Sequence, residues 1–227
     1  MKKIVIAIDG FSSCGKSTLA NELAKELNYV FVDSGAMYRA ITLYFLDHQI
    51  DVNNPNEVEA ALQNIKLEFI YQSDFKKSNI HLNGENVEQK IRDKNINSYV
   101  SIVAANKAVR EFAISEQQQM GLDKALVMDG RDIGTTVFPN AELKVFVTAD
   151  VDVRVERRFN ELQEKGFATT KEEVKNNLQE RDFIDSNRDF SPLKKADDAI
   201  VLDNSHLTKD EQLLLVLNWA NEKINLS

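Results

Sequence analysis

Nine consecutive residues near the N-terminus have the types and spacing of a phosphate-binding loop. They are Gly10-Phe11-Ser12-Ser13-Cys14-Gly15-Lys16-Ser17-Thr18, and they satisfy the pattern G-x-x-x-x-G-K-[ST]. Glycines at both ends let backbone N–H groups point inward at phosphate oxygens. Lys16 is then predicted to reach the β- and γ-phosphates, and the Ser17 hydroxyl to ligate Mg²⁺. A simple turn before a helix is the alternative, but the predicted strand before the loop and helix after it favour phosphate binding.

Two further charged segments follow predicted strands. The first is Asp33-Ser34-Gly35-Ala36-Met37-Tyr38-Arg39 and the second is Asp129-Gly130-Arg131-Asp132. Parallel-sheet proteins present ligand groups at the carboxyl ends of their strands, so Arg39 and Arg131 are predicted to bind phosphate. Asp129 is predicted to hold a Mg²⁺-bound water. A helix cap and a turn are the alternative interpretations.

Two arginine-rich sets have helical spacing. One comprises Arg154, Arg157 and Arg158, and the other Arg181, Asp185 and Arg188. Residues three, four or seven apart share one face of a helix, and such faces suit a transferring phosphoryl group. A solvated charged face is an equally good interpretation, because Glu156, Glu161 and Asp182 are close enough in sequence to neutralise these arginines.

The elements that must position these residues alternate between strands and helices. Short apolar, β-branched runs predict strands over residues 3–8, 30–32, 125–128, 143–147 and 199–202. Apolar residues at helical spacing predict helices over 16–27, 36–48, 151–165, 171–184 and 209–223. This alternation predicts a doubly wound α/β core with a parallel sheet.

The stretch over residues 56–88 interrupts that alternation. Residues 67–71 and 79–82 are typical of strands, and Asn83-Gly84 is a hairpin turn signal. We therefore expect a small inserted β unit that moves as a subdomain, followed by helical sequence over 95–120.

Composition and charge exclude several classes of protein. The chain has 227 residues with 28 Lys and Arg against 36 Asp and Glu, a net charge of −8 that disfavours a nucleic-acid surface. Its apolar runs are too short to cross a membrane. Cys14 is the only cysteine, which excludes an internal disulfide and a cysteine-based zinc site. We expect a monomeric, cytoplasmic protein with neither nucleic-acid nor membrane partners.

Taken together, these residues resemble the bacterial cytidylate kinases, a group within the nucleoside monophosphate kinase family of P-loop phosphotransferases. Besides the segments already quoted, the resemblance is carried by Val109-Arg110, Ile133-Gly134, 162–167 and Asn187. It covers nearly the whole chain. The sequence departs from the family pattern at Phe11, where proline is common, at Cys14, where alanine is common, and at Ile184 and Ser186.

The resemblance implies a P-loop NTPase core with a five-stranded parallel sheet flanked by helices. The core would comprise residues 1–55, 95–150 and 187–227. A small β-containing insert at about 56–94 would bind the nucleoside monophosphate, and a helical lid would span about 151–186.

The resemblance also implies the roles of individual residues. Substrate-binding residues would be Ser34, Arg39, Arg131 and Arg188 around the monophosphate, Ser101, Arg110 and Asp132 at the cytosine edge, and Arg181 and Asp185 near the ribose. Tyr38 would also bind the substrate. ATP would occupy the loop Gly10, Phe11, Ser12, Ser13, Cys14, Gly15, Lys16, Ser17 and Thr18, with Mg²⁺ at Ser17 and Asp129. The catalytic residues would be Lys16, Arg131, Arg157, Arg158 and Arg188.

The implied activity is direct phosphoryl transfer from ATP to CMP or dCMP, giving ADP and CDP or dCDP. Cytosine needs a group that accepts from its exocyclic amine and another that donates to the ring, and Asp132 and Arg110 have that chemistry. A P-loop kinase for UMP, AMP or a shikimate-like acceptor is the alternative enzyme. A nucleotide-dependent switch is disfavoured, because the segment nearest to a guanine-binding N-K-x-D motif, Asn106-Lys107-Ala108-Val109, lacks the acidic residue.

Overall fold

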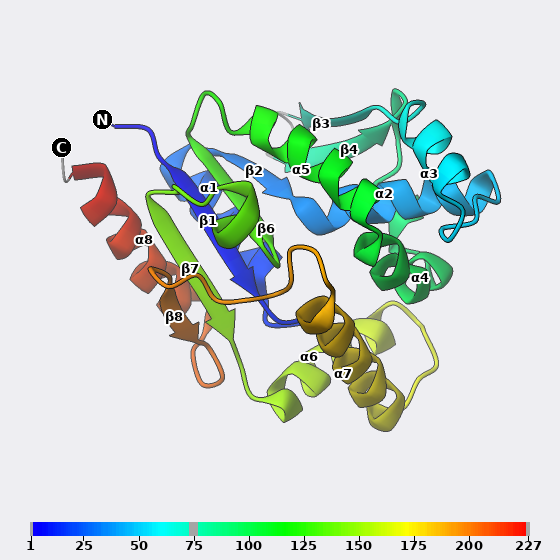
Figure 1. Ribbon diagram of the computed structural model, residues 1–227. Coiled ribbons are helices and arrows are strands. Elements are labelled where there is room, and N and C mark those ends of the chain that lie inside the picture. Colours follow the sequence, from blue (N-terminus) through cyan, green and yellow to red (C-terminus); the bar gives the residue numbers. More distant parts are fainter. Residues whose placement is uncertain (1, 73–76, 226–227) are drawn as a thin grey trace.

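A five-stranded parallel sheet lies at the centre of the computed structural model, which describes residues 2–72 and 77–225 (Figure 1). The strand order is β2-β6-β1-β7-β8, and every neighbouring pair is parallel. The strands are β1 (Val5–Gly10), β2 (Val30–Asp33), β6 (Leu126–Gly130), β7 (Leu143–Thr148) and β8 (Ile200–Asp203). All positions of β1 are buried because the strand is central and covered on both faces. The predicted five-stranded parallel sheet is confirmed.

Helices cover both faces of this sheet. Helices α1 (Lys16–Leu27) and α8 (Lys209–Asn225) lie on one face, and α2 (Ser34–Asp47) and α5 (Lys107–Met120) lie on the other. The other helices are α3 (Pro55–Leu62), α4 (Lys94–Ala105), α6 (Val151–Glu164) and α7 (Lys171–Asn187). Ile6 and Ile8 of β1 pack with α1 and α8, whereas Ala7 points to the opposite face and packs with α2 and α5. Within the residues that the structure describes, no helix is long and apolar enough to cross a membrane.

The insert contains a three-stranded antiparallel sheet of β3 (Leu67–Gln72), β4 (Lys77–Leu82) and β5 (Glu85–Asn86). The turn predicted between β4 and β5 is present, and Asn83 and Gly84 both have positive φ, 51° and 84°. The sequence analysis did not predict α3, which forms at the start of the expected β unit. The side chain of Asn54 caps α3 by accepting from the Asn56 N–H, and Pro55 stands at its first position.

The helical sequence after the insert forms two helices instead of one. Asn106 ends α4 with an extended backbone, and its side-chain oxygen accepts from the N–H groups of Ala108 and Val109 at the start of α5. The short π-helical segment η3 (Ile133–Val137) follows β6 and lies against β1.

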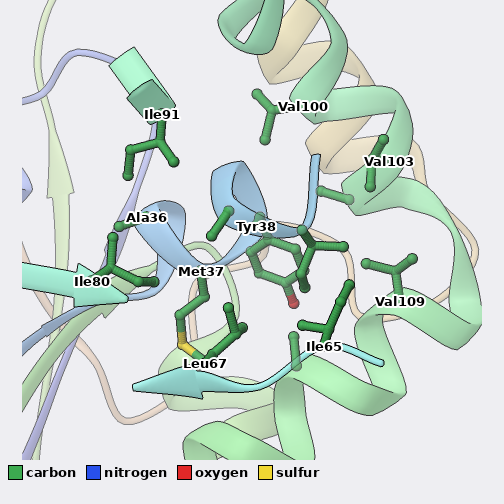
Figure 2. Close-up of a cluster of buried hydrophobic side chains, with 14 of the residues drawn as sticks. Ala36, Met37, Tyr38, Ile65, Leu67, Ile80, Ile91, Val100, Val103 and Val109 are labelled. Carbon is green, nitrogen blue, oxygen red and sulfur yellow. The ribbon is translucent and has the colours of Figure 1, made fainter. Parts of the chain in front are cut away.

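The insert shares one apolar core with the main sheet. Figure 2 shows Leu67 of β3, Ile80 of β4 and Ile91 of the 3₁₀ turn η2 (Lys90–Arg92) facing Met37 of α2 and Val109 of α5. These side chains belong to a single buried cluster that continues to the sheet through Ala7 of β1 and Met128 of β6. The insert is therefore packed into the body of the protein.

Helices α6 and α7 form a hairpin with a core of its own. The two helices lie next to each other beyond the carboxyl-terminal ends of β1 and β7 (Figure 1). Val155, Val174 and Leu178 are buried between them, with Phe159 and Leu162 packed against these three. Among the described residues, this cluster includes none from outside the hairpin.

Candidate active site

A cavity of about 940 Å³ opens at the carboxyl ends of the strands. Its lining brings together three segments that are far apart in sequence, the phosphate loop, the start of α2, and the segment after β6. The predicted site residues that line it are Ser12, Ser13, Gly15, Lys16, Ser17, Thr18, Ser34, Tyr38, Arg39, Ser101, Arg110, Asp129, Arg131, Asp132, Arg157, Arg158, Arg181, Asp185 and Arg188. One cavity therefore joins the phosphate loop to both arginine sets.

The phosphate loop runs from β1 into the N-terminus of α1. Gly10 has φ 147°, and a Cβ there would lie 2.0 Å from the Val147 carbonyl oxygen, so only glycine fits between the two strands. The Lys16 ammonium donates to the Phe11 carbonyl at 2.6 Å. Burial, with the nearby Arg131, lowers the pKa of Lys16 to about 8. An anion in the cavity would relieve this cost of burying the ammonium.

Ser17 and Asp129 offer the oxygen ligands that a magnesium ion prefers. The Ser17 hydroxyl donates to Asp129 Oδ2 at 2.7 Å, while Asp129 Oδ1 is buried without a hydrogen-bond partner among the described residues. Burial, with the neighbouring Asp33, raises the pKa of Asp129 to about 7. The described residues hold no group of three or more His, Cys, Asp or Glu side chains placed to bind a metal. A Mg²⁺ bound mainly by water and phosphate oxygens fits this donor set.

The end of the cavity formed by α2 and the insert carries two arginines around one carboxylate. Arg39 donates to Asp33 at 2.9 Å, and Asp33 also caps α2 by accepting from the Ala36 N–H. Arg92 of η2 lies 3.6 Å from Asp33 and donates to Glu88. Sequence analysis missed Arg92, because no local motif distinguishes it from other surface arginines. Ser34 lies at the same place and donates to the Asp129 carbonyl.

Arg110 of α5 and Asp132 form a buried ion pair deeper in the cavity. Their closest atoms are 2.5 Å apart, and Arg110 is 1% exposed. The guanidinium lies over the Tyr38 ring with 5.2 Å to its centroid, and its Nε has no hydrogen-bond partner in the part of the chain that the structure describes. Ser101 of α4 lines the cavity with them. The pair presents both a donor and an acceptor to a planar base.

Asp9 positions the segment that carries Arg131 and Asp132. Its carboxylate, 5% exposed, accepts from the backbone N–H groups of Ile133 at 2.8 Å and Gly134 at 2.7 Å. Burial raises the pKa of Asp9 to about 6. Sequence analysis did not single out Asp9, since it lies at the end of an apolar strand with no motif of its own.

Arginine is in excess between the two ends of the cavity. Arg131 Nε donates to Asp185 Oδ2 at 2.8 Å, and Arg188 contacts the other oxygen of Asp185 at 3.4 Å. Arg181 shares this region, and its Nε is buried without a hydrogen-bond partner within residues 2–72 and 77–225. Burial, together with the charge of Arg131, lowers the pKa of Arg181 to about 10. This excess of positive charge suits phosphate groups.

The arginines of α6 divide between the two arrangements considered from the sequence, namely local neutralisation by carboxylates and a position on the cavity. Arg154 pairs with Asp182, and Arg158 with Glu161 at 2.7 Å, which is the local neutralisation considered from the sequence. Arg157 instead donates to the side chain and carbonyl of Asn204, both at 2.9 Å. Arg157 and Arg158 line the cavity, whereas Arg154 is absent from its lining.

Three residues of the predicted ATP loop, Gly10, Phe11 and Cys14, are absent from the cavity lining. Phe11 packs edge-on against Phe146 of β7, with the ring centroids 5.8 Å apart. Cys14 is buried, and its carbonyl accepts from Asn204 Nδ2 at 2.8 Å. Conversely, Asn204, Lys209 and Gln212 line the cavity although no sequence motif marked them.

Comparisons with known proteins agree with the resemblance drawn from the motifs. The cytidylate kinase family model matches residues 6–222. A cytidylate kinase of Flavobacterium johnsoniae is 52% identical over 229 residues, covering 100% of both chains. A cytidylate kinase of Bacteroides fragilis is 54% identical over 215 residues, covering 93% of this chain and 94% of its own.

A solved structure of an uncharacterized protein from Eubacterium ventriosum has a TM-score of 0.52 and 12% identity to this chain. The match covers 97% of this chain and 99% of the other, and it shows a similar fold alone. The family is shown by the sequence matches, which extend over the loop, the strands and the arginine sets that meet in the cavity. The chain therefore belongs to the cytidylate kinase family.

Proposed function

We propose that the protein transfers the γ-phosphoryl group of ATP to CMP or dCMP, giving ADP and CDP or dCDP. One observation carries the proposal: a single cavity has a phosphate loop at one end and a buried arginine–carboxylate pair at the other. Relatives of the same length that are cytidylate kinases support it. They disfavour the alternatives, namely UMP, AMP or a shikimate-like acceptor, and a nucleotide-binding switch.

At the donor end, the loop from Gly10 to Thr18 would surround the phosphates of ATP, with its inward N–H groups and Lys16 as ligands. Ser17 and Asp129 would hold Mg²⁺, as their adjacency and the unpartnered Oδ1 of Asp129 suggest. When bound, Mg²⁺ supplies charge neutralisation at the phosphate oxygens.

At the acceptor end, Ser34, Arg39 and Arg188 would bind the monophosphate, and Arg92 joins them on the strength of its position beside Asp33. Arg110 and Asp132, with Ser101 and Tyr38, would contact cytosine, because the ion pair offers a donor and an acceptor at one edge. Arg181 and Asp185 would lie near the ribose.

The reaction requires no nucleophilic side chain, since a phosphate oxygen of the acceptor nucleotide is itself an anionic nucleophile. The protein would supply alignment and charge, with Lys16, Arg131, Arg157, Arg158 and Arg188 stabilising the transferred phosphoryl group. We further propose that residues 151–186 act as a lid that excludes water, and that residues 56–94 bind the monophosphate. The core would then comprise 1–55, 95–150 and 187–227.

Composition supports three narrower proposals. A net charge of −8 disfavours a nucleic-acid partner. A single cysteine, Cys14, is buried and free, as expected in the reducing cytoplasm. We also propose that the protein acts as a monomer with small-molecule nucleotides as its ligands.

An acceptor panel tests the function. ADP release from Mg·ATP would be measured with CMP, dCMP, UMP, AMP or shikimate, and without acceptor. We expect CMP and dCMP to raise the rate by at least about a hundredfold over the rate without acceptor, as expected when bound groups are aligned. Equal or greater stimulation by AMP or shikimate would contradict the proposal, and so would no stimulation by CMP.

A further inference from the structure

Ser12 of the phosphate loop connects the loop to the base of the α6–α7 hairpin. Its backbone N–H donates to Asp182 Oδ1 at 3.0 Å, and its carbonyl accepts from Arg154 Nη1 at 3.2 Å. Its hydroxyl accepts from Arg131 Nη2 at 2.9 Å. Ser12 is 2% exposed. Helices α6 and α7 thus both bond to one residue of the loop through side chains.

Arg154 and Asp182 are also bonded to each other. Arg154 Nη1 lies 2.5 Å from Asp182 Oδ2, and the two side chains are only 8% and 13% exposed. The guanidinium lies over the Phe11 ring, 5.4 Å from its centroid, and Phe11 packs on Phe146 of the sheet. A charge-assisted bond between shielded groups is stronger and more directional than a surface pair. The hairpin base is therefore bound to both the loop and the sheet.

The location of this pair within the hairpin determines what it controls. Arg154 lies in the first turn of α6 and Asp182 in the last two turns of α7, so both are at the end nearest the sheet. The apolar contacts that join α6 to α7 are internal to the hairpin. Polar bonds at the base consequently tie the hairpin to the phosphate loop, while α7 also packs beside α4.

We propose that Arg154 and Asp182 are positioning residues, which hold the hairpin base on Ser12 so that the hairpin covers the donor phosphates and keeps water from them. Neither residue lines the cavity, so they act through Ser12 and the hairpin and not by touching a nucleotide. The inference rests on the proposed function for the identity of the donor and acceptor.

Asp182→Asn is the principal test, because it keeps the shape and removes the charge, leaving the Arg154 guanidinium unpaired. We expect the dissociation constant for a non-hydrolysable Mg·ATP analogue to rise about tenfold, the scale of losing one hydrogen bond to a charged group. Hydrolysis of ATP without acceptor should rise about fivefold relative to transfer, because water reaches the γ-phosphate. CMP affinity should stay within about twofold, since the acceptor residues keep their partners.

Glu156→Gln is the matched control. Glu156 forms an ion pair with Lys171 that also joins α6 to α7, but both side chains are about half exposed and neither touches the phosphate loop. Donor affinity and the hydrolysis-to-transfer ratio should both remain within about twofold of wild type. Arg154→Lys is the second variant, used if Asp182→Asn does not fold. It keeps the charge but loses the planar fork, so we expect changes in the same direction of about threefold.

Three results would overturn the inference: a folded Asp182→Asn or Arg154→Lys protein with unchanged donor affinity and hydrolysis ratio, an equal effect of Glu156→Gln, or an equal loss of CMP affinity. A wild-type protein that does not phosphorylate CMP would overturn the proposed function. Donor affinity would still decide the inference in that case, because its measurement does not require CMP.

Discussion

The insert and the α6–α7 hairpin flank the same cavity but are attached to the body of the protein in different ways. Ile80 and Leu67 of the insert lie in the apolar cluster that reaches the central sheet. The hairpin has a separate cluster around Leu178, and its contacts with the body include the bonds of Arg154 and Asp182 to Ser12 and the packing of α7 beside α4. Continuous apolar packing couples the insert to the main core, whereas a few directional polar bonds hold the hairpin at its base.

The difference in attachment distinguishes the insert from the lid, which the sequence analysis treated alike. We expected both the insert and the lid to move. The shared core ties the insert, with Arg92, to α2 and its Arg39, and so favours a fixed acceptor end. The apolar core of the hairpin is separate from the main core, so we expect the hairpin to be the moving part. We infer that closure over the nucleotides is mainly a movement of the hairpin.

Lys16→Ala should have the largest effect, and it sets the scale for both regions because Lys16 lies between them. We expect kcat to fall about a thousandfold, since the lysine is directed at charge that develops in the transition state. The fold should be retained, because the ammonium bonds only to the Phe11 carbonyl among the hydrogen bonds of the described residues. Steady-state ADP release with CMP measures this effect, and near-normal turnover would remove Lys16 from the catalytic residues.

Ile80→Ala tests the attachment of the insert. Ile80 is 0% exposed within the shared cluster, so the truncation should lower the free energy of unfolding of the whole protein by about 3 kcal/mol. Urea denaturation followed by circular dichroism would show a single transition at lower urea. If the main transition stayed in place and a separate early one appeared, the insert would be an independent unit.

Asp132→Ala tests whether the acceptor end determines base selectivity. We expect the ratio of kcat/KM for CMP to that for UMP to fall about thirtyfold, because the acceptor for the exocyclic amine is lost. Ser98→Ala, a change at the cavity rim on α4, is the control and should leave the ratio unchanged. An unchanged ratio in Asp132→Ala would remove that residue from cytosine recognition.

Leu178→Ala should have the smallest effect on global stability, although Leu178 is as deeply buried as Ile80, at 1% exposure. Because its cluster is local to the hairpin, the main unfolding transition should shift by less than about 1 kcal/mol. Amide hydrogen exchange in α6 and α7 should accelerate about tenfold or more. A global loss as large as that from Ile80→Ala would show that the hairpin and the body unfold as one unit.

Much of the fold follows from local sequence signals. The phosphate loop, the five buried strands and the Thr170–Glu173 capping box at the start of α7 are each encoded within a few residues. The helix α3 was missed although Asn54-Pro55 is a helix-start signal, because the strands that follow dominated the pattern. The break at Asn106 was missed because one capping side chain divides otherwise continuous helical sequence.

The sequence analysis predicted less of the candidate site where contacts join segments that are distant in sequence. Motifs marked the residues of the loop and those after β2 and β6. No local pattern could pair Asp9 with the backbone of Ile133, which is 124 residues away, or Asn204 with the Cys14 carbonyl, 190 residues away. Spacing alone also left open whether the arginines of α6 are neutralised locally, and the structure shows that they divide between both arrangements.

The central claim is that donor and acceptor occupy one cavity together. Calorimetric titration of CMP into protein saturated with Mg²⁺ and a non-hydrolysable ATP analogue tests it most directly. The account predicts one CMP per chain, bound at least as tightly as without the analogue. If the analogue instead prevented CMP from binding, or if CMP did not bind in either condition, the two nucleotides could not share the cavity and the account would be contradicted.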